Sequence, residues 1–234
     1  MKVSCAKHLG SVLALGVCLT AGVAGAADDG WSVVSRSPVL IKTRATPGTS
    51  VKEVWAEATL DAEALDVQEA ILATSDYPDF MPYVKEARVL VNEAGPNAYY
   101  SYTRLTLPVI GGRDYVVKCT VDERIKEPGK GTFRQRWEAA PDLIPNRRSV
   151  SRIRINQGSW KVTPKGEGKS VIVYSILTDP GGVPGFVVDM ANRSGVTGTL
   201  EAVEKKAKAL GQRRELQEKR DRAASQEAQR QNAN

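Results

Sequence analysis

The stretch from Gly181 to Leu210, GGVPGFVVDMANRSGVTGTLEAVEKKAKAL, decides the fold that we expect for this chain. After a turn rich in glycine and proline, apolar residues recur mostly every three or four positions, which is the spacing of one helix face. They are Phe186, Val187, Met190, Val196, Leu200, Val203, Ala207 and Leu210. A long helix with one apolar face must pack on an apolar surface, and the segments before it have mainly strand patterns. We therefore predict an α+β fold, in which a curved antiparallel sheet is closed by one long helix around an internal space.

The segments before this helix alternate apolar and polar residues, as half-buried strands do. We expect strands over 39–44, 51–60, 84–92, 98–107, 114–124, 132–139, 149–156, 158–163 and 170–177, and a shorter helix over 62–73. The prolines and aromatic residues of 75–82 predict a packed loop without regular structure. The apolar loop 107–112 ends in two glycines, and we expect it either to cover another apolar surface or to be covered by one.

The first 26 residues have the features of a cleaved signal peptide. Lys2 and Lys7 precede an uncharged apolar run from Leu9 to Val23, and Ala24-Gly25-Ala26 fits the small-residue pattern of a cleavage site. The apolar run is short for a membrane span. We expect cleavage after Ala26 and a protein that works in the periplasm or outside the cell.

The chain divides into three parts in this interpretation: the signal peptide 1–26, one domain over 27–210, and a tail over 211–234. The length of 234 residues suits one sizeable domain. The tail is polar and charged, with Leu216 as its large apolar residue. Such a segment forms either a frayed extension of the helix or a disordered tail.

Cleavage of the signal peptide limits the catalytic and metal-binding chemistry of the mature chain. The signal peptide contains the one histidine, His8, and two of the three cysteines, Cys5 and Cys18. Cys119 then has no partner for an intramolecular disulfide, and no histidine is left for a catalytic triad or for a metal site of His and Cys ligands. We therefore expect no metal, no cofactor and no catalytic residue.

The charge distribution argues against a nucleic-acid partner. The formal net charge is +6, but basic residues alternate with acidic ones along the predicted strands. No dense basic block with interleaved aromatic residues is present, and such a block is the usual mark of a nucleic-acid surface. The charges are expected to form a solvated surface.

Several motifs resemble, in order and spacing, those of a secreted bacterial START domain, the StAR-related lipid-transfer domain of the helix-grip, SRPBCC-like superfamily. They are Asp76–Tyr83 (DYPDFMPY) with Val84–Leu90, then Arg113-Asp114-Tyr115, then Trp160–Pro164 with Tyr174 and Asp179–Pro184. The resemblance extends over residues 31–210. It implies a helix-grip fold with an internal apolar cavity, and binding or transport of a single lipid or sterol-like molecule. It also implies that Arg113, Asp114 and Tyr115 form a structural motif.

The alternation on the predicted strands selects side chains that point toward the internal space. The candidates are Tyr102, Val117, Cys119, Gln135, Trp137, Ile153, Ile155 and Trp160 on the strands, and Phe186, Val187 and Met190 on the helix. Ligand pockets are mostly apolar with few polar groups, although the same residues could fill an ordinary core. Gln135 is the most informative candidate, because a buried amide needs a hydrogen-bond partner.

Cys119 marks a departure from the family. Some sterol-binding members carry a charged side chain at about this place on the strand after the RDY motif, and a thiol cannot act as a charged anchor. This difference argues against a sterol ligand more than it argues against lipid binding in general.

Two other functions remain open beside a monomeric lipid carrier that contacts membranes transiently. A cyclase or aromatase of the same superfamily, acting on a polyketide-like substrate, would depend on Tyr102, Tyr115 and Arg113 as acid–base groups. An interaction domain would instead use the charged segment 212–231 to recruit a partner.

Overall fold

The structure, a computed structural model, describes residues 30–48, 51–91, 95–108, 111–181 and 185–232, with backbone alone at 91, 185–193 and 232. Its strands are β1 (Ser32–Ser35), β2 (Leu40–Ala45), β3 (Lys52–Leu60), β4 (Val84–Val91), β5 (Ala98–Leu107), β6 (Gly111–Glu123), β7 (Phe133–Ala139), β8 (Ser151–Arg152), β9 (Ile155–Pro164) and β10 (Ser170–Asp179). Its helices are α1 (Ala64–Leu72), the short 3₁₀ helix η1 (Thr74–Asp76), α2 (Tyr77–Phe80) and α3 (Gly185–Asn232). The predicted signal peptide lies outside the described residues.

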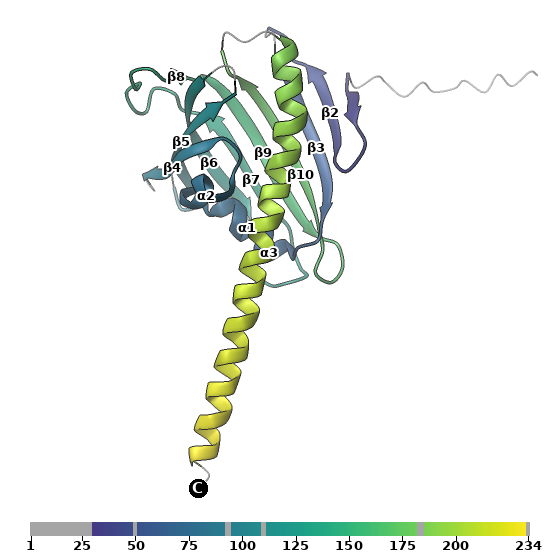
Figure 1. Ribbon diagram of the computed structural model, residues 1–234, viewed down its shortest axis with the longest axis vertical. Coiled ribbons are helices and arrows are strands. Elements are labelled where there is room, and N and C mark those ends of the chain that lie inside the picture. The colour runs from purple at the N-terminus through teal and green to yellow at the C-terminus, as the bar shows by residue number, and fades with distance from the viewer. Residues whose placement is uncertain (1–29, 49–50, 92–94, 109–110, 182–184, 233–234) are drawn as a thin grey trace, which may run out of the picture.

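The strands form one sheet in the order β1-β2-β3-β10-β9-β7-β6-β5-β4, and β8 runs parallel to the start of β6. Along that order, neighbouring strands are antiparallel. Figure 1 shows the sheet curving around α3, which crosses one face with α1 and α2 on the same side. The predicted arrangement of a curved antiparallel sheet and a long C-terminal helix is confirmed, and the sheet is open.

The middle of α3 packs against α1 and the sheet. Its buried residues follow the predicted spacing of four, three and four positions: Val196, Leu200, Val203 and Ala207. In α1, four residues of the same core cluster are fully buried and mainly small: Ala64, Val67, Ala70 and Ile71. Small residues let two helices approach closely, so this contact closes the core at one end of the sheet.

One ion pair fixes α3 to α1 at the end of this contact. Asp66, which is buried, accepts hydrogen bonds from both terminal nitrogens of Arg214. Gly211 is needed there, because a Cβ at that position would lie 2.8 Å from the Asp66 Oδ2 atom. The beginning of the expected tail therefore belongs to the packed domain.

Beyond this contact, α3 continues as an exposed helix that projects well past the sheet (Figure 1). Residues 215–231 are all exposed. Within the described ranges, no helix is both long and apolar enough to cross a membrane.

The segment 75–82 is more regular than its sequence predicted. It forms the end of η1 and all of α2, so the expectation of a loop without regular structure is wrong. Pro78 lies in the first turn of α2, where a backbone N–H has no partner within the helix and proline is tolerated.

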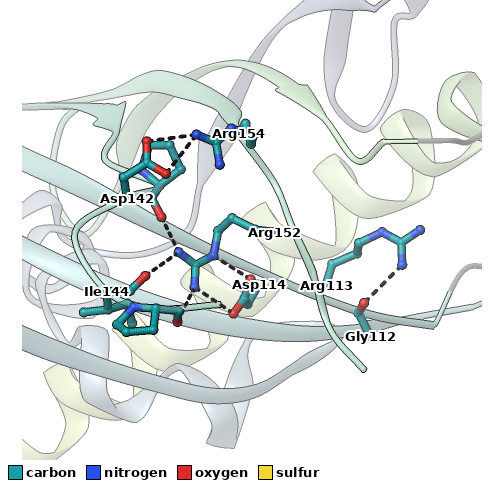
Figure 2. A network of polar contacts seen from close by, with 9 residues as sticks. Gly112, Arg113, Asp114, Asp142, Ile144, Arg152 and Arg154 are labelled. Carbon is teal, nitrogen blue, oxygen red and sulfur yellow. Dashed lines mark hydrogen bonds and ion pairs between the residues drawn. The ribbon is translucent and has the colours of Figure 1, made fainter. Parts of the chain in front are cut away.

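The predicted strand over 149–156 is also wrong in its extent. The structure has only the two residues of β8, then a break, and β9 begins at Ile155. The break follows Arg152, whose side chain is buried in a network with the preceding loop (Figure 2).

Arg152 and Asp114 form a buried ion pair, with side chains 3% and 1% exposed. The Arg152 Nε donates to Asp114 Oδ1 at 2.7 Å, and its Nη2 donates to Oδ2 at 3.2 Å. Further guanidinium hydrogen bonds go to the carbonyl oxygens of Ile144 at 3.2 Å, of Pro145 at 3.4 Å and of Pro141. Because these bonds satisfy both charged groups, the network holds the loop between β7 and β8 against β6.

We predict that Arg152→Ala lowers the free energy of unfolding by about 3–5 kcal/mol, because it leaves the Asp114 carboxylate buried without a countercharge. Urea unfolding of the variant and of the unmodified chain measures this difference. Arg154→Ala is the matched control, since Arg154 pairs with Asp142 at 2.8 Å with both side chains more than half exposed. The Arg154→Ala variant should lower the free energy of unfolding by less than about 1 kcal/mol. Equal losses in the two variants would contradict this account of the network.

Candidate functional site

A cavity of about 470 Å³ lies between the concave face of the sheet and the helices. Side chains from β5, β6, β7, β9 and β10 line the sheet side. The segment between α1 and β4 closes the cavity with Thr74, Tyr77, Met81, Pro82 and Tyr83. The helix α3 closes it with Ser194, Gly195, Val196 and Thr199. The volume lies within the range of pockets that enclose small hydrophobic ligands.

Six of the predicted candidates line this cavity: Val117, Cys119, Gln135, Trp137, Ile153 and Trp160. The backbone of α3 passes through Phe186, Val187 and Met190, but their side chains lie outside the described residues. Leu107 and Pro108 of the apolar loop also face the cavity, while positions 109 and 110 are outside the described ranges.

The placement of Tyr102 in the cavity was wrong. On β5 the cavity side chains are Tyr99, Ser101 and Thr103, so the pleat directs Tyr102 to the opposite face. There its ring is covered by the guanidinium groups of Arg88, at 5.2 Å, and Arg147, at 5.1 Å. These arginines bury a tyrosine that would otherwise be on the outside of the sheet.

The placement of Ile155 beside Ile153 was wrong for a related reason. Ile153 is 4% exposed and lines the cavity, whereas Ile155 is 37% exposed. The chain between them is not a regular strand, so the two-residue period does not carry across the break. The Ile153 N–H donates to the Asp114 carbonyl at 2.8 Å, which fixes Ile153 beside the start of β6.

Three aromatic rings form an apolar cluster at the centre of the sheet. Trp160 stacks on Tyr174 with centroids 4.1 Å apart, and Trp137 lies 5.9 Å from Tyr174. Trp137 has room because Gly158 is its neighbour on β9; a Cβ on Gly158 would lie 2.4 Å from the Trp137 ring. The indole N–H of Trp137 donates to Asn156 Oδ1 at 2.9 Å, so this polar edge is satisfied within the protein.

A small polar group lies at the end of the cavity beneath η1. Gln135, 3% exposed, donates from Nε2 to the Tyr99 hydroxyl at 3.0 Å, and that hydroxyl is also 3.2 Å from Thr74 Oγ1. Close by, Ser101 Oγ and Cys119 Sγ are 3.9 Å apart. The sequence pattern identified Gln135 but missed its partner Tyr99, on β5, and Thr74 of η1, which contacts the same Tyr99 hydroxyl.

Arg113, Asp114 and Tyr115, which form the RDY motif, each make a different contact. Arg113 donates from Nε to the Pro180 carbonyl at 2.9 Å, and so joins β6 to the end of β10, just before α3. Asp114 pairs with Arg152 rather than with its neighbour Arg113 (Figure 2). Tyr115 lines the cavity. Asp114 bonds on the face of β6 opposite Tyr115, whereas Arg113 alternates onto the same face as Tyr115 and donates to Pro180, which itself lines the cavity.

The described part of the cavity lining carries no charged side chain. Among the described side chains that line it, none is Asp, Glu, Lys, Arg or His. Burial raises the pKa of Cys119 to about 11 and of Tyr99 to about 12, and it also raises the pKa values of Tyr77, Tyr115 and Tyr174. These groups keep their protons at neutral pH.

A metal site finds no support in the described part of the chain. No group of three or more His, Cys, Asp or Glu side chains gathers there. Cys119 is a buried free thiol.

The curved sheet, the long C-terminal helix and the mostly apolar cavity between them are those of a helix-grip protein. A family model described as polyketide cyclase / dehydrase and lipid transport matches residues 60–230. Since the match extends over most of the chain, the protein belongs to this family.

Solved structures agree with this assignment. A STAR-related lipid transfer protein from Xanthomonas axonopodis is 26% identical with a TM-score of 0.67, over 77% of this chain and 99% of that one. The human StAR-related lipid transfer protein 5 has the same fold, with a TM-score of 0.66 at 17% identity, over 78% of this chain and 88% of that one. The resemblance to START domains drawn from the sequence motifs is confirmed.

A Pseudomonas aeruginosa protein named Uncharacterized protein PA1579 is 32% identical over 124 residues. The alignment covers 50% of this chain and 58% of that protein. This chain thus matches little more than half the length of that relative.

We predict that alkylation of Cys119 by iodoacetamide becomes about tenfold faster with each pH unit between pH 8 and pH 10. Burial disfavours the thiolate, so the folded thiol stays protonated where an exposed one, with a pKa of about 8.5, has already ionised. Peptide-resolved mass spectrometry separates Cys119 from other cysteines. Protein unfolded in urea is the control, and its rate should level off above about pH 9. A folded-state rate that also levels off there would contradict the raised pKa.

Proposed function

We propose that this protein binds one lipid or similarly hydrophobic molecule in its cavity, without chemical change, and carries it outside the cytoplasm. The observation that supports this most strongly is the cavity itself: about 470 Å³, lined by apolar and aromatic side chains with a few neutral polar groups. Apolar surface removed from water contributes roughly 25 cal/mol per Å². A hydrophobic molecule that fills such a space is therefore held without any charged anchor.

The sequence of the first 26 residues supports the proposed location. Residues 1–26 resemble a signal peptide, and a carrier in the periplasm or outside the cell would have to cross water between membranes. We propose that it acts as a monomer and contacts a membrane only while it loads or releases its ligand. The buried free thiol suits such a compartment, because a buried, protonated thiol is slow to oxidise.

A cyclase or aromatase function is the second candidate, because the matching family model includes polyketide cyclases. Of the three groups that such chemistry was expected to use, only Tyr115 lines the cavity. Tyr102 is on the opposite face and Arg113 donates to the Pro180 carbonyl. The raised pKa of Tyr115 makes it a poor base at neutral pH, so the cavity favours binding over catalysis.

We predict that Val117→Trp weakens binding of the neutral fluorescent dye Nile red at least tenfold. The larger ring would occupy cavity space and leave the sheet intact, since Val117 points into the cavity. Fluorescence titration measures the affinity, and thermal unfolding checks that the melting temperature is kept.

Val89→Trp is the matched control, because Val89 is an exposed valine on the neighbouring part of the same sheet, on β4. It should bind the dye as the unmodified chain does. If the unmodified chain binds no dye, or if Val117→Trp binds it equally well, the cavity is not the binding site.

A further inference from the structure

Three arginines gather around Tyr102 on the outer face of the sheet, opposite the cavity. Arg88 on β4 is the register partner of Tyr102, and Arg104 lies two residues further along β5, so both point to the same face as Tyr102. Arg147 reaches this place from the loop before β8, and its guanidinium lies 5.1 Å from the centroid of the Tyr102 ring. The side chains of Arg88, Arg104 and Arg147 are 51%, 38% and 44% exposed, so a dissolved molecule can reach all three.

One carboxylate, that of Glu86, is shared by the three arginines. Glu86 accepts two hydrogen bonds from Arg147, at 2.7 and 3.0 Å. The Nε atoms of Arg88 and Arg104 are each 3.6 Å from a Glu86 oxygen, which is beyond hydrogen-bond distance. Three positive charges thus surround one negative charge, and the cluster keeps a positive excess.

Two buried donors in this cluster have no acceptor. Among the side-chain nitrogen and oxygen atoms buried in the described ranges, two lack a hydrogen-bond partner: the Tyr102 hydroxyl and the Arg104 Nε. Tyr102 as a whole is 0% exposed. Buried polar groups are almost always hydrogen-bonded, so two unpaired donors on neighbouring side chains indicate that an acceptor binds beside them.

The Tyr102 hydroxyl is a donor at neutral pH and lies beside the arginines. Burial, and after it the charge of Asp114, raises the pKa of Tyr102, so the hydroxyl keeps its proton. The charges of Arg147 and Glu86 also act on this pKa, which shows that the hydroxyl is close to both. The charge of Asp114 is balanced by Arg152 in the buried ion pair, so it does not cancel the positive excess of the cluster.

A phosphate group fits this combination of charge and donors. Guanidinium groups bind phosphate oxygens through pairs of parallel hydrogen bonds, and a phosphomonoester carries about −1.5 to −2 charges at pH 7. A carboxylate has fewer oxygens and a single charge. The loop that carries Arg147 is held against β6 by the hydrogen bonds from Arg152 to the carbonyl oxygens of Ile144 and Pro145, so this side of the cluster is fixed in place before any anion arrives.

We propose that Tyr102 and its three arginines form a binding site for a phosphate group on the outer face of the sheet, separate from the cavity. The guanidinium groups hold the phosphate oxygens, the Tyr102 hydroxyl donates to one of them, and Glu86 keeps Arg147 in position. The phosphate comes from a small soluble ester or from a lipid head group, which present the same chemistry. The site does not depend on what the cavity binds.

Calorimetric titration of the full chain with glycerol 3-phosphate, at pH 7.5 in a chloride buffer without phosphate or sulfate, tests the site. We expect one molecule to bind per chain with a dissociation constant of about 1 mM or lower. Arg88→Gln should weaken binding at least tenfold, because it removes a charge and a pair of donors. Arg134→Gln is the matched control, since Arg134 is 45% exposed and pairs with Glu123 on another part of the sheet. It should leave the affinity unchanged.

Tyr102→Phe separates a built site from a general attraction between an anion and surface arginines. The substitution removes only the hydroxyl, which has no partner within the protein, so the midpoint of urea unfolding without phosphate should not fall. Affinity for glycerol 3-phosphate should fall about fivefold to tenfold, the effect of losing one hydrogen bond to a charged group. Unchanged affinity in the folded Tyr102→Phe variant would overturn the site as assigned.

Sedimentation with phosphatidylcholine vesicles, with and without phosphatidic acid, identifies the source of the phosphate. Binding to the vesicles that contain phosphatidic acid, lost in Arg88→Gln, assigns the site to a lipid head group; binding of glycerol 3-phosphate alone assigns it to a soluble ester. If neither binds, or if Arg88→Gln and Arg134→Gln bind equally well, the proposal is wrong. Nile red should bind Arg88→Gln as it binds the unmodified chain, so failure of this site and failure of the cavity function are measured separately.

Discussion

Burial of the apolar side of α3 against α1 and the concave sheet is the constraint on which the rest of the structure depends. Leu200, Val203 and Ala207 close the core beside α1, and the pair of Asp66 and Arg214 fixes the helix there. Nearer its start, α3 lies over the cavity through Val196 and Thr199. Because a straight helix cannot follow a curved sheet along its whole length, the same packing that makes a core at one end leaves space at the other.

The absence of charged side chains from the described cavity lining is the second constraint, and Asp114 of the RDY motif shows how a charge is kept out of it. A buried charge is stable only when it is paired and hydrogen-bonded. Asp114 satisfies this rule with Arg152 outside the cavity, and Arg113 with the carbonyl of Pro180. Only Tyr115 enters the cavity from this motif. The ion pair of Asp114 and Arg152, which holds the loop before β8 against β6, thus lies away from the surface that a ligand would touch.

The hydrophobic pattern was enough to predict the sheet, the long helix and six of the residues that line the cavity, because burial follows the two-residue and the three-to-four-residue periods. It failed where the period did not apply. Tyr102 can be buried on either face of β5, and it was the arginines from β4 and the loop before β8 that decided which. The strand break after Arg152 reversed the position expected for Ile155. The contact of Gln135 with Tyr99 joins β7 to β5 and could be found only once both strands were placed in space.

The most direct test of the central claim is native mass spectrometry of the protein purified from its own host, followed by organic extraction of any molecule that comes with it. The account predicts a mass increase that corresponds to one bound molecule, and an extract that contains a hydrophobic compound in equal amount to the protein. Protein that is empty when purified, and that stays empty after incubation with lipid vesicles, would contradict it.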